Sequence, residues 1–399
     1  MYAFRRPFAA AGYVDAPLQV AIAGRIIEAK TLFLIAQVFG YCVSKFAGVK
    51  VCSELPRARL GLALVACIVT SWLALLAFAV LPAGWKPVAL FLNGMPLGVV
   101  WGLVVRYLEG RKVSELLLAA LSCSYILASG EVKRVGAWLL EKGVDEYWMP
   151  FATGAMFVLP FVISVGLLSL LPPPSAEDEM LRAKRQVMGR GERLAFARRF
   201  LPGLVILCVF YLFLTAYRDF RDSYQADLFV EMGIMDAAAF SRTERPVAFG
   251  VMILLALAFL VKGARRGLAT VYLLMMAGMV VLGGSTMLFS AGLIGGETWM
   301  MVSGFGAYLT YVPFGSVLFD RIIAATRFTG TAVFAIYLAD ALGYSGSVGM
   351  MIYRDIFAGE ISRLEFFRDF SLWLAMGGLP LLFTASVYFL GRAKQAPGM

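Results

Sequence analysis

Arginines stand inside segments that are otherwise apolar enough to lie in a membrane. Arg5 and Arg6 occur in the run YAFRRPF, and about half a chain later Arg218 and Arg221 occur in FLTAYRDFR. A guanidinium stays charged and is costly to place in hydrocarbon, so it normally faces a protein interior or a wet cavity. Its planar N–H donors match a carboxylate or phosphate in bidentate geometry. The sequence therefore predicts a central cavity that attracts anions.

Two other interpretations of these arginines remain open. Arg5 and Arg6 could snorkel to the outer interface of the membrane. Arg218 and Arg221 could be neutralised by the aspartate that follows each of them in the sequence. Either arrangement would remove cations from the predicted cavity.

Four further ionisable groups fall within apolar segments. Asp340 lies thirteen residues past Arg327, which is about 20 Å along a helix. A lone carboxylate at that depth needs a cation or a proton, so Asp340 could neutralise an arginine, act as a protonation switch that couples transport, or make a polar contact within the bundle. Glu131 and Arg134 are three residues apart and could pair on one helix face. Lys133 points elsewhere, either into the cavity or into an ion pair.

The composition is that of a polytopic membrane protein. Of the 399 residues 60% are apolar and only 16% are charged, and the mean hydropathy is +0.79. A soluble domain of this length would carry more charge. The alternating pattern of an outer-membrane barrel is absent. The net charge of +10 is therefore assigned to loops that border a lipid bilayer, and no nucleic-acid partner is expected.

Apolar segments near the length of a bilayer crossing recur along the chain. We predict an all-α, major-facilitator-like bundle of 12 helices in two six-helix halves, residues 1–171 and 200–399, joined by a basic cytoplasmic linker over 172–199. Residues 1–14 are expected to be the outer part of an incomplete first helix, whose beginning would lie upstream of Met1 in a longer natural chain. The other spans are predicted near 30–50, 60–82, 87–107, 113–140, 147–171, 200–226, 246–262, 267–290, 298–320, 328–352 and 369–391.

The basic residues gather in every second loop, as the positive-inside rule requires. This distribution predicts that both termini are cytoplasmic and that the protein lies in a bacterial inner membrane. Outside the linker, the residues concerned are Arg57, Arg59, Arg106, Arg111, Lys112, Lys262, Arg265, Arg266, Arg321, Arg327, Arg392 and Lys394.

Several kinds of chemistry are excluded or disfavoured by what the sequence contains. There is no histidine, which removes His-based metal sites, His proton relays and Ser-His catalysis. The five cysteines form no CxxC pair, so apolar packing is expected in place of metal or disulfide use. No Walker A or dinucleotide-binding glycine pattern is present. We predict no enzyme activity, no metal and no cofactor.

Small residues in the segment 87–107 predict close helix packing. Gly94, Gly98 and Gly102 are spaced four residues apart and share a helix face. Asn93 and Pro96 could also let this helix bend or gate.

The N-terminal motifs resemble the first two helices of the organophosphate:phosphate antiporters, a branch of the major facilitator superfamily. The resemblance implies that Arg5 and Arg218 hold a substrate phosphate, that Tyr41 and Lys45 assist, and that Tyr2 lies nearby. The motifs that carry it are Tyr2-x-x-Arg5-Arg6-x-Phe8, Gly40-Tyr41-x-x-Ser44-Lys45-Phe46-x-Gly48 and Pro56-Arg57.

A longer set of motifs resembles an uncharacterised family of bacterial major-facilitator-like proteins. This second resemblance extends over nearly the whole chain and implies a fold without a known substrate. The motifs are Asn93-Gly94-x-Pro96-Leu97-Gly98-x-x-Trp101-Gly102, Leu108-Glu109-Gly110-Arg111-Lys112 and Ser129-Gly130-Glu131-Val132-Lys133.

These observations favour a monomeric secondary transporter of a small organic anion, phosphorylated anions included, that works by alternating access. Asp340 or Lys133 would tune coupling, and Glu131 would belong to the same group of charges. A transporter-like sensor that signals through the 172–199 loop is the main alternative. A membrane-embedded enzyme or a lipid translocase is a third class, which would show clustered acids with a nucleophile or a lateral opening.

Overall fold

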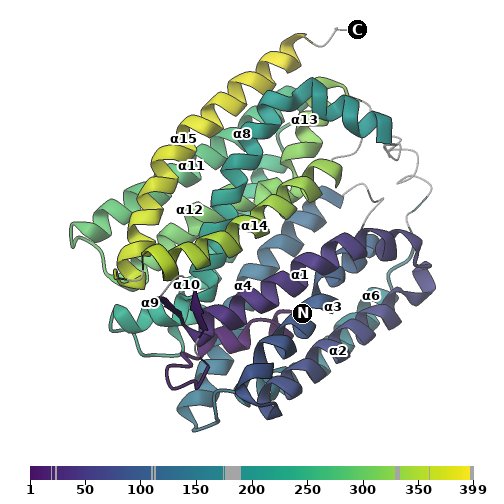
Figure 1. The fold of residues 1–399 in the computed structure, drawn as a ribbon. Helices are drawn as coiled ribbons and strands as arrows, with labels where there is room; N and C mark the ends of the chain where they lie inside the picture. Colours follow the sequence, from purple (N-terminus) through teal and green to yellow (C-terminus); the bar gives the residue numbers. More distant parts are fainter. Residues whose placement is uncertain are drawn as a thin grey trace.

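The computed structural model describes residues 1–18, 20–22, 25–108, 111, 114–173, 175, 190–328, 333–358 and 360–395. Long α-helices dominate these residues and pack along one another into a bundle (Figure 1). The predicted helical bundle is confirmed.

The long helices follow the predicted apolar segments in order. Within the described residues, the eleven segments correspond to nine long helices and two bent pairs. The first part of the chain forms α1 (Ala29–Glu54), α2 (Leu60–Val80), α3 (Lys86–Leu108), α4 (Ser114–Glu141) and the bent pair α5 (Met149–Met156) and α6 (Val158–Ser169). The second part forms α8 (Arg190–Ser223), α9 (Gln225–Glu231), α10 (Ala239–Phe259), α11 (Ala264–Ser290), the bent pair α12 (Gly296–Ser316) and α13 (Leu318–Thr326), α14 (Val333–Phe357) and α15 (Arg363–Gln395). Short 3-10 turns, η3 (Arg57–Arg59) and η4 (Ala83–Trp85), precede α2 and α3.

Length and apolarity identify the helices that can cross a membrane. Six of the described helices pass this test, and eight spans do so if each bent pair counts as one. The two helices of the first pair are bent by 45° and those of the second by 53°. Pro160 lies just after the first bend and has no N–H to donate to the carbonyl four residues earlier, which explains the break near Phe157.

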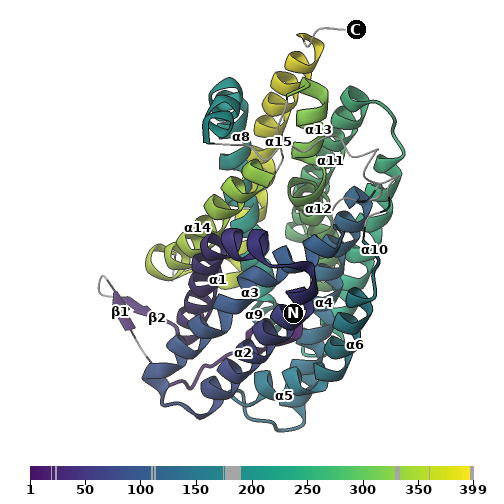
Figure 2. The same cartoon turned by 90° about the vertical axis from the view of Figure 1, so that its right-hand side faces the viewer.

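The N-terminal segment differs from the incomplete helix that the sequence predicts. It forms two 3-10 turns, η1 (Tyr2–Phe4) and η2 (Pro7–Ala10), and every residue from Tyr2 to Ala9 is buried. Pro7 has no N–H to donate to a preceding carbonyl, so the first turn ends at the arginine pair and η2 begins at the proline. An antiparallel hairpin of β1 (Val20–Ile22) and β2 (Arg25–Ile27), which the sequence analysis did not anticipate, then projects from the side of the bundle (Figure 2).

The two parts of the chain pack within themselves and against each other. In the first part α1 packs on α3, α3 on α2, and α2 on α6. In the second part α8 packs on α14 and α15, and α11 on α12 and α15. Contacts of α4 with α10 and α12, and of α1 with α14, join the two parts. Most of the predicted linker lies outside the described residues, but its end does not form a loop, because α8 already begins at Arg190.

The glycines of α3 allow the closest helix contact in the first part. A Cβ atom on Gly94 would lie 2.2 Å from the carbonyl oxygen of Gln37, and one on Gly98 would lie 2.6 Å from that of Tyr41. Both carbonyls belong to α1, so a larger side chain would push α1 and α3 apart. The predicted role of these two glycines in close packing is confirmed.

Candidate functional site

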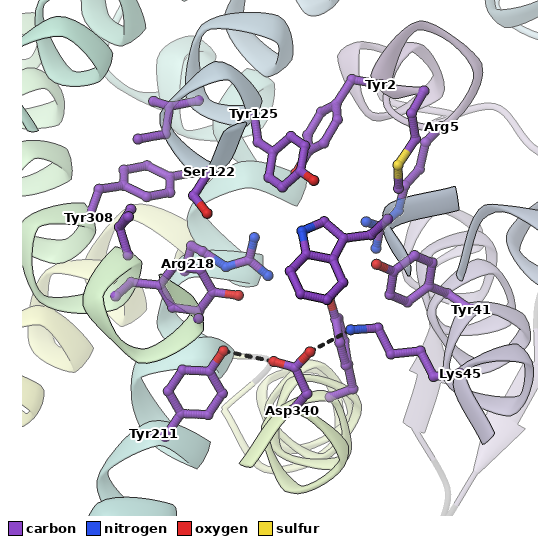
Figure 3. A pocket seen from close by; sticks show the side chains of 17 residues that line it. Tyr2, Arg5, Tyr41, Lys45, Ser122, Tyr125, Tyr211, Arg218, Tyr308 and Asp340 are labelled. Carbon is purple, nitrogen blue, oxygen red and sulfur yellow. Dashed lines mark hydrogen bonds and ion pairs between the residues drawn. The ribbon is translucent and has the colours of Figure 1, made fainter. Parts of the chain in front are cut away.

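A cavity lies between the two parts of the chain (Figure 3). Its solvent-accessible volume is about 80 Å³, several times the roughly 10–15 Å³ that one water molecule needs. Side chains from η1, α1, α3, α4, α8, α12 and α14 line it. Among them are all five residues predicted to bind substrate, and also Asp340: Tyr2, Arg5, Tyr41, Lys45, Arg218 and Asp340.

Arg5 is buried and reaches the cavity from the turn between η1 and η2. Its side chain does not snorkel to the surface, because only 2% of the residue is exposed. The guanidinium carbon lies 4.1 Å from the centroid of the Tyr41 ring. Among the described residues, neither Nε nor Nη2 of Arg5 has a hydrogen-bond acceptor. A buried charged donor without an acceptor is costly, so this arrangement favours an anion in the cavity.

Three polar side chains hold the backbone that carries Arg5. The Asn93 side-chain amide donates to the carbonyl oxygen of Phe4 at 2.9 Å, and the Ser71 hydroxyl donates to the same oxygen at 3.3 Å. The Gln37 amide donates to the carbonyl oxygen of Arg5 at 2.9 Å and to Oδ1 of Asn93 at 2.7 Å. These bonds satisfy carbonyls that a non-helical turn would otherwise leave unpaired in the interior. The sequence analysis considered Asn93 only as a site of helix bending.

Arg218 reaches the cavity from α8 and is partly neutralised. Its Nη2 lies 2.6 Å from Oδ1 of Asp219, so the predicted pairing with the following aspartate is present. Asp219 also accepts from the hydroxyl of Ser347 at 2.7 Å and lies 3.4 Å from Nη2 of Arg6. The Arg218 guanidinium carbon lies 4.4 Å from the centroid of the Tyr311 ring, and its buried Nε has no acceptor among the described residues. Part of the guanidinium therefore stays available to a ligand.

A third cation is paired with Asp340 at the edge of the cavity. Nζ of Lys45 on α1 lies 2.5 Å from Oδ2 of Asp340 on α14, and the hydroxyl of Tyr211 donates to Oδ1 at 2.9 Å (Figure 3). The counter-charge of Asp340 is thus a lysine, where the sequence analysis considered an arginine. The two side chains are 12% and 16% exposed, so cavity water can reach the pair.

The remaining predicted charges do not line the cavity. Arg6 Nε lies 2.8 Å from Oδ2 of Asp222, and Nζ of Lys133 lies 2.7 Å from Oδ1 of the same carboxylate. Arg221 pairs with Glu244 at 2.7 Å, so the proposed pairing of Arg221 with the next aspartate is wrong. All five side chains are buried, and Lys133 occupies an ion pair, which was the second of its two predicted settings.

Glu131 lies at the side of α4 that faces α10, away from the cavity lining. Its Oε2 lies 3.3 Å from Nε of Arg134, which is the predicted pair across one helical turn. Its other oxygen accepts from Arg245 of α10. Glu131 therefore belongs to a charge pair that helps to join the two parts of the chain.

Aromatic side chains make up most of the rest of the cavity wall, and the sequence analysis named few of them. The Tyr211 and Tyr311 rings stack with centroids 5.5 Å apart, as do those of Tyr2 and Tyr125. The three-residue spacing of Tyr308 and Tyr311 is the one sequence signal that could have shown a shared face. Tyrosine gives this wall hydroxyl donors as well as flat apolar surfaces. The further lining aromatic residues are Trp101 and Tyr344.

The charged groups of the lining give the cavity a positive character. Arg5, Lys45 and Arg218 contribute three cations, and Asp340 contributes one carboxylate. The lining stays positive when the buried Asp219 beside Arg218 is counted as well. Because the cavity lies inside the protein, this excess acts on a ligand with less screening than at the surface.

A family model covers almost the whole chain. The model of DUF5690, described as a family of unknown function, matches residues 7–392. The chain belongs to this family. No curated protein matches the chain by sequence.

Two solved structures show how widely the fold is shared. The chain is similar to a crystal structure of a D-xylose-proton symporter, with a TM-score of 0.60, 14% identity, and coverage of 96% of this chain and 94% of the symporter. It is also similar to a bacterial homologue of the human lysosomal transporter Spinster in an inward-facing, unoccupied conformation, with a TM-score of 0.55, 12% identity, and coverage of 99% and 94%. At these identities the likeness concerns the fold.

These findings support one of the two resemblances seen in the sequence and not the other. Membership of a family of unknown function with a major-facilitator-like fold agrees with the longer set of motifs. They do not support the specific resemblance of the N-terminal motifs to the organophosphate:phosphate antiporters. The roles of Tyr2, Arg5, Tyr41, Lys45 and Arg218 therefore rest on the geometry of the cavity.

Proposed function

We propose that this protein is a secondary transporter that carries a small organic anion, phosphorylated anions included, by alternating access. The anion would bind in the central cavity between Arg5 and Arg218. One observation carries the proposal: the buried guanidinium of Arg5 lines a positive cavity with two donors that have no acceptor among the described residues. A bound carboxylate or phosphate would supply those acceptors and offset the cost of the buried charge.

The pair of Lys45 and Asp340 gives the proposal a means of coupling. A substrate anion that draws Lys45 away from Asp340 leaves that carboxylate without its cation. Binding of the anion would therefore be coupled to a change in this contact between α1 and α14, with Tyr211 still in contact with the carboxylate.

Alternating access requires the two parts of the chain to move against each other. We propose that residues 1–171 and 200–399 act as the two moving halves, because the cavity takes side chains from both and the pair of Lys45 with Asp340 crosses between them. We also propose a monomer in a bacterial inner membrane with both termini cytoplasmic, which rests on the distribution of basic residues.

Flux through reconstituted protein tests this function. Proteoliposomes would be loaded and assayed with labelled inorganic phosphate, glycerol 3-phosphate and succinate, with and without a pH gradient. We expect accumulation of at least one anion and loss of most of it in Arg218→Lys, because lysine cannot reproduce the planar donor pair. Arg266→Lys, at the exposed start of α11, is the matched control and should transport normally.

The same assay separates a transporter from a sensor. A sensor would bind one of these anions, but the vesicles would accumulate none of it. Binding without accumulation, in vesicles that retain folded protein, would contradict the proposed function.

A further inference from the structure

Helices α2 and α6 pack side by side (Figure 1). Residues of both helices line a groove. Its solvent-accessible volume is about 670 Å³. Leu62 on one wall is 72% exposed and Val162 on the other is 52% exposed. Because these helices belong to an integral membrane protein, the groove faces lipid acyl chains along its length.

Two glycines shape this groove. A Cβ atom on Gly166 of α6 would meet nothing within 4 Å, so the missing side chain leaves open space. A Cβ atom on Gly61 of α2 would lie 3.0 Å from the Ser169 hydroxyl and 3.6 Å from the Tyr107 hydroxyl. Gly61 therefore sits close to the floor of the groove, and Gly166 opens its side.

The groove ends at a cation. Among the residues that the structure describes, Arg57 is the one charged member of the lining. Its Nη2 donates to the carbonyl oxygens of Leu171 and Pro172 at 3.0 and 3.1 Å, which fixes the guanidinium beside the end of α6. Both of these bonds use Nη2, so they leave Nε and Nη1 to other contacts. Arg59, two residues further on, is exposed at the same end.

We infer that this groove binds an anionic phospholipid. The headgroup phosphate would take the remaining donors of Arg57, and an acyl chain would lie over Gly61 and Gly166. Charge complementarity at one end and apolar walls along the rest match the two chemistries of such a lipid, and basic pockets at this edge of a membrane favour anionic headgroups. A free phosphate would use only Arg57 and leave the apolar walls exposed. This inference requires the membrane location alone and is independent of the transported substrate.

Native mass spectrometry of the delipidated full chain tests the inference, with phosphatidylglycerol and phosphatidylcholine titrated separately. We expect phosphatidylglycerol to bind the wild type more tightly than phosphatidylcholine. Arg57→Gln should weaken phosphatidylglycerol binding by at least about fivefold, the effect of one basic residue at the surface. It should weaken phosphatidylcholine binding less, because the choline ammonium already offsets the charge of that phosphate. Gly166→Leu should weaken both lipids, because it fills the groove.

Two matched variants and one competitor complete the experiment. Gly284→Leu introduces the same side chain at an exposed glycine of α11 whose Cβ also meets nothing within 4 Å, and Arg266→Gln removes an exposed arginine elsewhere; both should bind lipid like the wild type. Melting curves confirm that each variant is folded. Unchanged phosphatidylglycerol affinity in folded Arg57→Gln and Gly166→Leu would overturn the inference. Full competition by inorganic phosphate would also overturn it, because the site would then recognise the free ion.

Discussion

Arg5 and Arg218 make similar contacts at the wall of the cavity. Each guanidinium lies over a tyrosine ring, at 4.1 Å for Arg5 and 4.4 Å for Arg218. Each also has a buried Nε without an acceptor among the described residues. A ring attracts a cation without neutralising it, so the aromatic contacts hold both side chains without removing their charge, although Asp219 partly neutralises Arg218.

Replacement of Tyr41, whose ring lies under Arg5, separates the contribution of the aromatic face from that of the hydroxyl group. Tyr41→Leu removes the aromatic face and should weaken binding of the anion by about 2- to 30-fold, the range that corresponds to a cation–π contact of about 0.5–2 kcal/mol. Tyr41→Phe keeps the face and is the matched control. Calorimetric titration with the anion that stabilises the wild type measures the difference. Equal losses in both variants would instead assign the effect to the Tyr41 hydroxyl.

Lys45 and Asp340 should behave as a pair in stability measurements. Lys45→Met leaves a carboxylate in a poorly solvated place and should lower the free energy of unfolding by about 3 kcal/mol, the lower end of the range for a broken buried pair, because both side chains are slightly exposed. Lys45→Met/Asp340→Asn removes both charges and should recover much of that loss. Unfolding in mixed micelles gives both values. Additive losses would show that the two groups do not interact.

At the scale of elements, the position of Arg5 depends on three helices that come later in the chain. Gln37 on α1, Ser71 on α2 and Asn93 on α3 bond the carbonyl oxygens of Phe4 and Arg5. The turn that carries the arginine is therefore fixed by tertiary contacts in place of helical hydrogen bonds.

Asn93→Leu tests this dependence. The substitution leaves the Phe4 carbonyl with the weaker Ser71 contact alone and should cost about 1–3 kcal/mol of stability. Because the turn would shift, anion affinity should fall as well, while Ser122→Ala at the cavity edge should leave stability unchanged. Melting temperature and affinity measured together decide the point. A loss of stability with unchanged affinity would show that Asn93 does not position Arg5.

The same elements show what could be predicted from the sequence. The long helices follow from apolar segments whose length matches a bilayer, but α8, α10 and α15 each begin at least six residues before the predicted segment. The 3-10 turns at the N-terminus could not be predicted, because the partners of their carbonyls lie between 32 and 89 residues away along the chain. A polar residue in an apolar helix indicates that it has a buried hydrogen-bond partner, but the sequence does not identify that partner.

At the scale of the molecule, buried charges join the two parts of the chain. Asp222 of α8 holds Arg6 from the N-terminal segment and Lys133 from α4. At the ends of other helices, Arg363 of α15 contacts Glu28, and Lys30 of α1 contacts Asp227 of α9. The convergence of Arg5 and Arg218 could be predicted, because each part of the chain has arginines within an apolar segment. The ion pair of Lys133 with Asp222 could not be predicted, because it depends on how α4 and α8 are placed relative to each other.

Asp222→Asn should weaken this junction. The change leaves Arg6 and Lys133 without their shared carboxylate, and removal of one member of a buried ion cluster costs about 3–5 kcal/mol. Lys133→Met in the same background should restore part of the stability by removing one stranded charge. Thermal unfolding of the single and double variants checks this. A stable Asp222→Asn protein would show that the cluster contributes little to the contact between the two parts.

The central claim is that Arg5 and Arg218 together hold one small anion. The most direct measurement is the melting temperature of purified wild type, Arg5→Lys, Arg218→Lys and the control Arg266→Lys with inorganic phosphate, glycerol 3-phosphate, succinate, benzoate or the neutral sugar xylose, because a ligand stabilises the protein according to its affinity. We predict that at least one anion raises the melting temperature of the wild type and the control, that neither cavity variant responds to it, and that xylose has no effect. Stabilisation by xylose that persists in both cavity variants, with no response to any anion, would contradict the account.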